Sequence, residues 1–533
     1  MSGGELISEK LGLNVKLLYS SIVAYQLNIV GGIFSIFYIT ILARALTVEE
    51  YGIWVMIIRY IGYFAIPSVV FTYWLPRDIS RGKNTSKTGL VYSLAMGAIL
   101  TPVYIAFVWG ASSELEQPLL PLLLSSSIII LEYLNAALMY TSQGHAPQIV
   151  GFGQFAFKAG QAISGIIMIS GIHLGLTGAV LSVLFGRLCM DLLMLRQNLP
   201  ILRKSRLNPQ TAITWAKSSW RSLFGSLTCL VFWLDVLIVS LIFGSEVPVA
   251  YYGICITILT VITYASSIPS ALYPKVLAKR NLEDMGEAIW LTLVITIPIA
   301  AFIILYAEPI CAILGTKYLP AAVPLRVFSV ASVLQVVSGI AVISYLGLEG
   351  KDSSTLTQRE LLRSTIFKND LVNMAINIVY IGGISISAYY LSDPVAVASS
   401  WGAWMCISFV ISLAVLGMLI SRDFAQKFPF LVLGRDSLLL TLPAAPLAAM
   451  PLLFPVDAFS TLWLLVPVLV AHIVAFFLAY VGILYLVSKR FRKTLNDARV
   501  EIWGALRGAF GRNGGGAAVQ GEGGTPQEPP KEQ

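Results

Sequence analysis

Six charged side chains lie inside long apolar stretches of the sequence, well away from the polar segments that separate those stretches. A charge in the hydrocarbon core of a membrane costs several kcal/mol unless it faces water or a partner. Each of these residues is therefore a candidate for binding an ion or a charged substrate. The six residues are Arg59, Glu132, Lys158, Arg187, Asp191 and Asp235.

The three cations among them suit a ligand that carries phosphate. Arginine can bind phosphate oxygens through two parallel hydrogen bonds, whereas lysine acts as a point charge. We therefore predict that Arg59, Lys158 and Arg187 contact an anionic head group. Arg59 is the principal candidate because its own segment places no carboxylate near it.

Structural ion pairs are the alternative for the other two cations. Asp191 follows Arg187 by four residues, so the two share a helix face and can neutralise each other. Glu132 and Lys158 can pair between neighbouring helices. With three cations against two carboxylates, this half of the chain keeps one net positive charge.

Asp235 is the deep carboxylate of the second half of the chain. It can hold a proton or a sodium ion that drives transport, or it can pair with a cation of the first half and hold one conformation. The two roles can belong to one mechanism in which substrate phosphate competes for the cation. Asp235, Glu132 and Asp191 thus form the predicted group for ion coupling or for pairing between halves.

Other polar residues of the apolar stretches could contact sugar, although a tyrosine in a membrane helix is more often an interface anchor or a packing residue. These residues are Tyr25, Gln26, Asn28, Gln154 and Asn377. Four prolines could bend their helices and allow rocking, with a static kink as the simpler interpretation. They are Pro67, Pro102, Pro269 and Pro298.

Membrane helices must position these side chains. The 533 residues are 57% hydrophobic and only 12% charged, whereas roughly a quarter of a soluble domain is charged. Apolar runs of about 20 residues cross a bilayer as helices. We predict an all-α polytopic membrane protein with about fourteen spans. The spans are 17–42, 51–75, 88–110, 119–140, 149–171, 176–196, 221–243, 249–273, 288–307, 322–346, 370–391, 396–420, 436–454 and 460–488.

The distribution of basic residues predicts the orientation. Of the 36 lysines and arginines, thirty lie in alternate loops and both termini, four lie within spans, and two, Arg44 and Lys317, lie in the remaining loops. Because basic residues favour the cytoplasmic side, both termini are predicted to be cytoplasmic. The net charge of +8 then faces the anionic inner leaflet and requires no nucleic acid.

The sequence lacks the motifs that are typical of several functional classes. The chain has no phosphate-binding GxxxxGK[ST] loop, its three histidines are isolated, and its five cysteines fall in or beside spans as packing residues. The predicted outer loops are too short for a folded catalytic domain. We therefore expect a transporter and not an enzyme, with no cofactor and no metal.

A repeat divides the chain. "ILARALTVEEYGIW" leaves the first span, and "LIFGSEVPVAYYGIC" leaves the seventh, so Tyr51-Gly52-Ile53 and Tyr252-Gly253-Ile254 lie 201 residues apart. This spacing predicts two six-helix lobes in a parallel repeat. Thr47 is the predicted cap of the second span, with Glu50 at its third position. The predicted parts are a cytoplasmic N-terminus (1–16), the first lobe (17–196), a basic linker (197–220), the second lobe (221–420), two additional helices (421–488) and a basic, largely disordered tail (489–533).

Four pieces of sequence resemble the polysaccharide and O-antigen flippases of the multidrug/oligosaccharidyl-lipid/polysaccharide exporter superfamily. They are "ILARALTVEEYGIW", "WLDVLIVSLIFGSEVPVAYYGI", "ALYPKVLAKRN" and "EPICAILGTKYLPAAVPLRVFSVAS". The resemblance covers residues 17–420. The inner segment 347–369 departs from it, because that segment is longer and more charged than is usual in this family.

The resemblance implies a plasma-membrane flippase that moves a polyprenyl- or dolichyl-(di)phosphate-linked oligosaccharide to the outer leaflet by alternating access. Membrane lipids and glycosyltransferases or a polymerase of the same pathway would be its partners. The alternatives are a drug or cation antiporter of the same superfamily, a lipid II-type flippase, and a non-transporting scaffold of a glycan assembly complex. An antiporter would be expected to have twelve spans and an acidic cavity, and a scaffold gains nothing from deep charges.

Overall fold

A computed structural model describes residues 30–264, 285–348, 364–456 and 461–496, together with residues 27, 282 and 499. The regular structure of these residues is entirely helical. The chain divides into two compact units, Met1–Val474 and Ala475–Gln533. The description below concerns the first unit, apart from the bounds of the last helix.

The first helix group comprises the helices between residues 30 and 204. Its members are Val30–Ala45, α2 (Val48–Ala65), η1 (Ile66–Ser68), α3 (Val69–Ser80), α4 (Ser86–Glu114), α5 (Leu119–His145), α6 (Gln148–Gly165), η2 (Ile166–Gly171) and α7 (Gly175–Lys204). The predicted second span is interrupted by the 3₁₀ turn η1, which contains Pro67. Proline lacks an N–H donor, so the α-helical ladder breaks there. Pro102 lies inside the continuous helix α4.

The second helix group comprises the helices between residues 220 and 424. Its members are α9 (Trp220–Trp233), α10 (Asp235–Phe243), α11 (Val247–Thr263), α14 (Met285–Leu305), α15 (Ala307–Leu314), η4 (Thr316–Ala321), α16 (Ala322–Leu348), α18 (Thr365–Tyr390) and α19 (Pro394–Phe424). Pro298 lies inside α14. Pro269 and most of the segment 347–369 lie outside the described residues.

Helix α8 (Pro209–Ser218) follows the first group within the predicted linker. Asn208 caps this helix by accepting a hydrogen bond from the Thr211 N–H at 3.3 Å. Trp215 is buried, and its Nε1 donates to Asp78 of α3 at 3.0 Å. The basic linker is therefore a packed helix.

The last helices are α20 (Phe430–Thr441), α21 (Ala444–Leu447), α22 (Met450–Leu453) and α23 (Leu462–Val487). The predicted span at 436–454 is thus broken into short pieces. Pro443, Pro446 and Pro451 lie at or beside these breaks, as expected for residues that cannot donate to a helical ladder.

Eleven helices of the described part are long and apolar enough to cross a membrane. Val30–Ala45 and Val247–Thr263 are shorter apolar helices, and the predicted span 149–171 corresponds to α6 followed by the π-helical turn η2. Each of the fourteen predicted segments therefore contains helix. The lengths and composition support a multi-pass membrane protein, whereas the count of fourteen and the cytoplasmic termini remain predictions.

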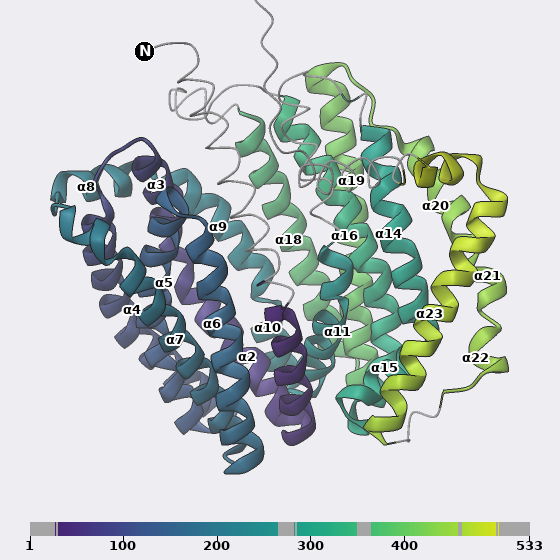
Figure 1. Ribbon diagram of the computed structural model, residues 1–533, viewed down its shortest axis with the longest axis horizontal. Helices are drawn as coiled ribbons and strands as arrows, with labels where there is room; N and C mark the ends of the chain where they lie inside the picture. The colour runs from purple at the N-terminus through teal and green to yellow at the C-terminus, as the bar shows by residue number, and fades with distance from the viewer. Residues whose placement is uncertain are drawn as a thin grey trace, which may run out of the picture. The chain divides into compact units, whose positions relative to one another are not determined.

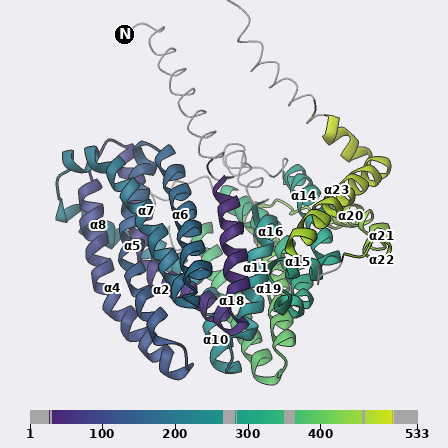
Figure 2. The same ribbon diagram turned by 60° about the horizontal axis from the view of Figure 1, so that its bottom comes forward.

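The helices pack mainly within their own group. In the first group α5 lies against α3, α4 and α7, and α6 lies against α7. In the second group α16 and α19 pack together, with α11, α14 and α18 around them (Figure 1). A second view shows the same separation between the blue helices of the first group and the green helices of the second (Figure 2). Helices α2 and α11 pack across the two groups.

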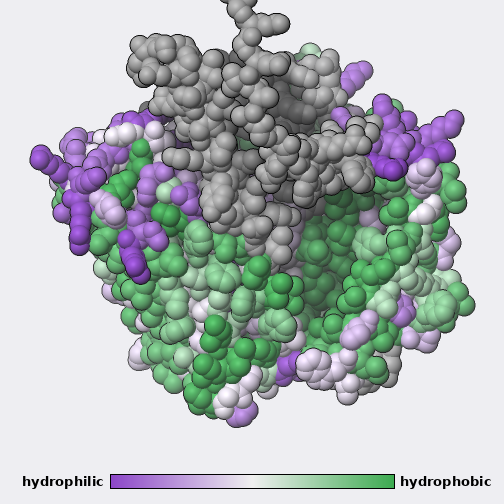
Figure 3. Space-filling model, in the orientation of Figure 1, coloured by the Kyte–Doolittle hydropathy of each residue, from purple (hydrophilic) through white to green (hydrophobic). Residues whose placement is uncertain are grey.

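The surface agrees with a membrane environment. On the face in Figure 3, hydrophobic residues cover the flank around α6 and α7, and hydrophilic residues gather at the end near α8. Large apolar side chains such as Leu431 and Trp463 are 91% and 89% exposed. An exposed apolar surface of this extent would be unfavourable in water and is expected on helices that face lipid.

Candidate functional site

Arg59 lies on α2 where the two helix groups meet. Its Nη2 donates a hydrogen bond to the Tyr252 hydroxyl of α11 at 2.6 Å. The guanidinium carbon lies 5.5 Å from the ring centre of Trp233 and 5.7 Å from that of Tyr252. Among the described residues, no carboxylate forms an ion pair with Arg59. Aromatic rings therefore hold this cation, and most of its five N–H donors remain available.

Asp235 is fully buried at the start of α10. Its Oδ1 accepts from the Val236 N–H at 2.8 Å. Its Oδ2 accepts from the Tyr380 hydroxyl at 2.9 Å and from Trp401 Nε1 at 3.2 Å. Three donors thus compensate for the loss of water around this carboxylate.

The link between Arg59 and Asp235 runs through aromatic rings and not through a direct ion pair. The rings of Tyr252 and Trp401 stack with centres 4.1 Å apart and planes 7° apart. Tyr252 accepts from Arg59, and Trp401 donates to Asp235. One role predicted for Asp235 from the sequence was an ion pair with a cation of the first half of the chain. In the described structure the two groups form no direct ion pair, and each contacts one ring of this stacked pair.

The partners of Arg187 and Glu132 differ from the sequence expectation. Arg187 of α7 forms an ion pair with Glu132 of α5 and lies over the Phe157 ring, 4.7 Å from its centre. Asp191 instead accepts from Asn135 Nδ2 at 3.1 Å. The reason is that α5 and α7 lie side by side, so residues of one helix meet partners across the contact instead of along their own helix.

Lys158 of α6 is half-buried, and its Cδ packs over Gly31, where a Cβ atom would lie only 2.8 Å away. The expected pair with Glu132 does not form, because Glu132 is engaged by Arg187. Lys158 has no hydrogen bond or ion pair with the described residues. Arg59 and Lys158 are therefore the predicted head-group cations that the described structure leaves without a carboxylate partner.

The residues predicted to contact sugar lie in different parts of the structure. Asn377 Nδ2 donates to the Thr228 carbonyl of α9 at 2.9 Å, beside a cavity of the second group. Gln154 lies on α6 and reaches Met139 Sδ at 3.9 Å. Tyr25, Gln26 and Asn28 lie outside the described residues.

Known structures share this architecture, whereas no protein-family description and no curated protein matches the chain. "Lipid II flippase MurJ, inward closed conformation" aligns with a TM-score of 0.64 and 14% identity, over 87% of this chain and 99% of that one. A multidrug resistance MATE family transporter of the MOP superfamily, in an inward-facing conformation, aligns with a TM-score of 0.58 and 14% identity, over 73% and 94%. The chain shares its fold with these two transporters.

The repeated Tyr-Gly pairs lie where the two helix groups touch. A Cβ atom on Gly52 would collide with the backbone carbonyl of Glu246, and one on Gly253 would collide with Val55. Gln117 Nε2 also donates to the Glu246 carboxylate at 3.0 Å. We call this contact between α2 and α11 the outer seam, because it lies beside the predicted outer loops. The repeat is visible in the sequence, whereas the contact between its two copies is seen only in the structure.

Arg44 and Lys317 add a reciprocal contact beside the outer seam. Arg44 Nε donates to the Ile313 carbonyl at the end of α15 at 2.9 Å. Lys317 Nζ donates to the carbonyls of Arg44, at 3.2 Å, and Leu46. Each cation thus reaches carbonyls at or just beyond the C-terminal end of a helix in the other group, where the helix dipole is negative. These are the two basic residues that the sequence places in outer loops.

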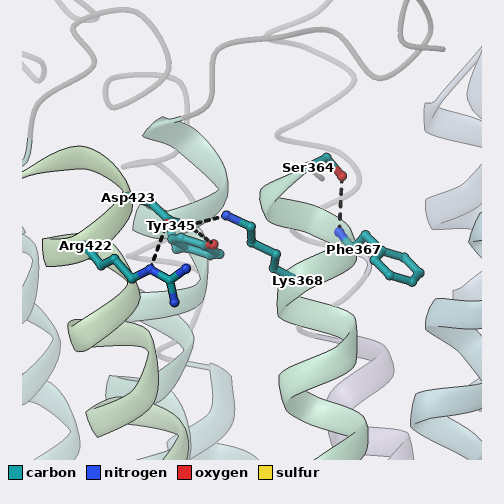
Figure 4. Close-up of polar contacts among 6 residues, drawn as sticks. All are labelled: Tyr345, Ser364, Phe367, Lys368, Arg422 and Asp423. Atoms are coloured by element: carbon teal, nitrogen blue, oxygen red, sulfur yellow. Dashed lines mark hydrogen bonds and ion pairs between the residues drawn. The ribbon is translucent and has the colours of Figure 1, made fainter. Parts of the chain in front are cut away.

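A polar cluster connects three helices of the second group near the first turn of α18 (Figure 4). Asp423 of α19 accepts from Lys368 Nζ of α18 at 2.6 Å and from the Tyr345 hydroxyl of α16 at 3.0 Å. Arg422 lies 3.9 Å from the other carboxylate oxygen. Ser364 caps α18 by accepting from Phe367 N–H at 3.3 Å. These contacts link α16, α18 and α19 at one end.

Proposed function

We propose that the protein is a flippase for a polyprenyl- or dolichyl-(di)phosphate-linked oligosaccharide, moving it from the inner to the outer leaflet of the plasma membrane. The observation that carries the proposal is the aromatic environment of Arg59. The Arg59 guanidinium contacts Tyr252 and Trp233 and keeps unpaired N–H donors. These donors can form two parallel hydrogen bonds with phosphate oxygens.

The charge balance supports an anionic head group over a cationic drug. Glu132 is neutralised by Arg187, and Asp235 is enclosed by hydrogen-bond donors. Arg59 and Lys158 are the cations that these contacts leave over. A site for a cationic drug would be expected to place a carboxylate, and not a guanidinium, against the rings of Tyr252 and Trp233.

A structural role is proposed for Arg187 in place of the predicted contact with the head group. We assign it, with Glu132 and Asp191, to the structural joint between α5 and α7 because each has a partner there. Phosphate binding is proposed for Arg59 and Lys158. Asp235 is proposed as the ion-coupling group, because the rings of Tyr252 and Trp401 connect it to the phosphate-binding cation.

Alternating access requires the two helix groups to separate and rejoin at each end. The outer seam is closed in this structure through α2 and α11. We propose that the conformation is one in which the outer end is shut. Glycosyltransferases or a polymerase of the same pathway would supply or consume the lipid.

Arg59→Ala tests the proposal in liposomes that contain a fluorescent polyprenyl-diphosphate oligosaccharide. The flipping rate should fall at least about tenfold, because a charge-assisted hydrogen bond is lost. Arg59→Lys should retain part of the rate. Arg326→Ala is the matched control, since Arg326 lies on α16 and pairs at 3.1 Å with Glu308. An unchanged rate for Arg59→Ala would remove Arg59 from the site.

A lipid II-type flippase is the second candidate, because the lipid II flippase structure aligns over 87% of this chain. Competition distinguishes the two. Unlabelled lipid II should inhibit flipping no better than undecaprenyl diphosphate if another glycan is the natural cargo. Strong inhibition by lipid II alone would favour the second candidate.

A further inference from the structure

A cavity of about 320 Å³ lies inside the second helix group, between α9, α16, α18 and α19. We call it the second-group pocket. Polar side chains, among them the carboxylate of Asp370, form one part of its wall, and aromatic and aliphatic side chains form another. The uncharged polar residues of the wall include Gln335, Ser338, Asn373, Asn377 and Ser412.

Some of these polar groups are already paired and others are not. Ser338 donates to Ser412 at 3.1 Å, and the Asn377 amide nitrogen donates to a backbone carbonyl at 2.9 Å. Gln335 and Asn373 have no hydrogen bond with the described residues. Their two amides and the Asn377 carbonyl oxygen are therefore available to a ligand.

The composition of the wall indicates the chemistry of that ligand. Amides can both donate to and accept from hydroxyl groups, and the rings of Phe232, Trp233 and Phe409 supply flat apolar surfaces. Sugars have hydroxyl edges and an apolar ring face. Typical ligand pockets measure about 300–1,000 Å³, so this cavity matches one or two sugar rings.

Trp233 connects the pocket to the proposed phosphate site. It lines the pocket, and its ring lies 5.5 Å from the Arg59 guanidinium carbon. In a lipid-linked oligosaccharide the first sugar is bonded directly to phosphate. A sugar site must therefore adjoin the phosphate site, as this pocket does.

The pocket wall is also preformed. The Asp423 cluster joins α16, α18 and α19 near one end of these helices (Figure 4), and the same three helices contribute Gln335, Asn373 and Ser412. A wall that does not have to be ordered on binding loses less entropy.

We propose that the second-group pocket binds the phosphate-linked sugar of the lipid-linked oligosaccharide through Gln335, Asn373 and Asn377. The inference rests on the proposed flippase function. It assigns head-group recognition to two places, with phosphate at Arg59 and the first sugar within the second group.

Cysteine protection provides the direct test. Cys229 lines the pocket and is exposed. In a Cys189→Ser, Cys406→Ser background, the remaining cysteines Cys255 and Cys311 are buried. The rate of maleimide labelling at Cys229 is measured with undecaprenyl phosphate, and then with the lipid-linked oligosaccharide fraction of the source membranes. The glycosylated fraction should slow labelling at least about tenfold, whereas undecaprenyl phosphate should not. Equal protection by both probes, or none by either, would overturn the assignment.

Amide variants provide the second test. Asn373→Leu and Gln335→Leu keep approximate side-chain size and remove hydrogen bonding. Each should reduce flipping of the glycosylated fraction about tenfold and leave binding of undecaprenyl phosphate unchanged. Gln143→Leu, on the exposed end of α5, is the matched control. Wild-type flipping by both variants would refute the pocket while leaving the flippase proposal intact. If the wild-type protein flips no lipid-linked oligosaccharide, the proposed function itself fails.

Discussion

At the residue scale, the deep charges fall into two kinds. Glu132, Arg187 and Asp191 have partners within the first helix group. Arg59 and Asp235 instead each form a hydrogen bond with one ring of the same stacked pair, Arg59 with Tyr252 and Asp235 with Trp401. A change at either residue can therefore affect the other through Tyr252 and Trp401, which makes the aromatic pair the natural place for coupling between cargo and ion.

Asp235→Asn tests that coupling. Asparagine can still accept from Tyr380 and Trp401, but it carries no charge and has no group that takes up and releases a proton in this pH range. Flipping under an imposed proton or sodium gradient should fall to the rate without a gradient, because the driving ion no longer binds. The measurement is the ratio of the two rates in proteoliposomes. Asp393→Asn is the control, since asparagine also caps helices well and Asp393 caps α19. A wild-type response in Asp235→Asn would exclude the coupling role.

The Glu132–Arg187 pair gives a stability prediction of its own. Both side chains are 20% exposed, so losing one partner leaves a largely buried charge. Arg187→Met and Glu132→Gln should each destabilise the protein by roughly 2 kcal/mol. The double variant should be less destabilised than the sum of the two. Thermal unfolding in detergent measures the three variants, and strictly additive losses would show that the pair has no structural role.

At the element scale, the success of sequence reasoning depended on distance along the chain. Thr47 and Glu50 are three residues apart, and the predicted capping box forms, with hydrogen bonds of 3.1 and 2.8 Å. Apolar runs likewise predicted the helices. The donors to Asp235 could not be predicted, because Tyr380 and Trp401 are 145 and 166 residues away. The partner of Arg187 also depended on which helices lie side by side, which local spacing does not specify.

The close approach of α2 and α11 yields a prediction for the helix contact. Gly52→Ala places a methyl group against the Glu246 backbone, which cannot move as freely as a side chain. The outer seam should then open, and outward-open molecules should become more abundant. Electron-spin distances between labels at Glu49→Cys and Ser245→Cys report the opening. Gly110→Ala is the matched control, because a Cβ atom there meets nothing within 4 Å. An unchanged distance distribution would mean that the contact does not limit opening.

At the scale of the whole molecule, two basic residues in predicted outer loops are exceptions to the otherwise one-sided distribution of lysine and arginine among the predicted loops. Arg44 and Lys317 are explained by the contacts they make, since each binds helix-end carbonyls of the opposite group. In the sequence, these residues bear only on the predicted orientation. Their contacts with helix-end carbonyls explain why basic residues occur in loops where they are otherwise rare.

This reciprocal contact should help to set the balance between the closed and open outer end. Each cation at a helix C-terminus contributes about 0.3–1 kcal/mol when exposed. Arg44→Gln with Lys317→Gln should therefore raise the ratio of open to closed molecules roughly fivefold, equivalent to about 1 kcal/mol. The spin labels at positions 49 and 245 measure this ratio, and high salt should produce a smaller shift in the same direction in the wild type. A Lys427→Gln control, far along the chain on the predicted inner side, should leave the ratio unchanged. If the double variant has the wild-type ratio, the contact follows closure of the outer seam and does not stabilise it.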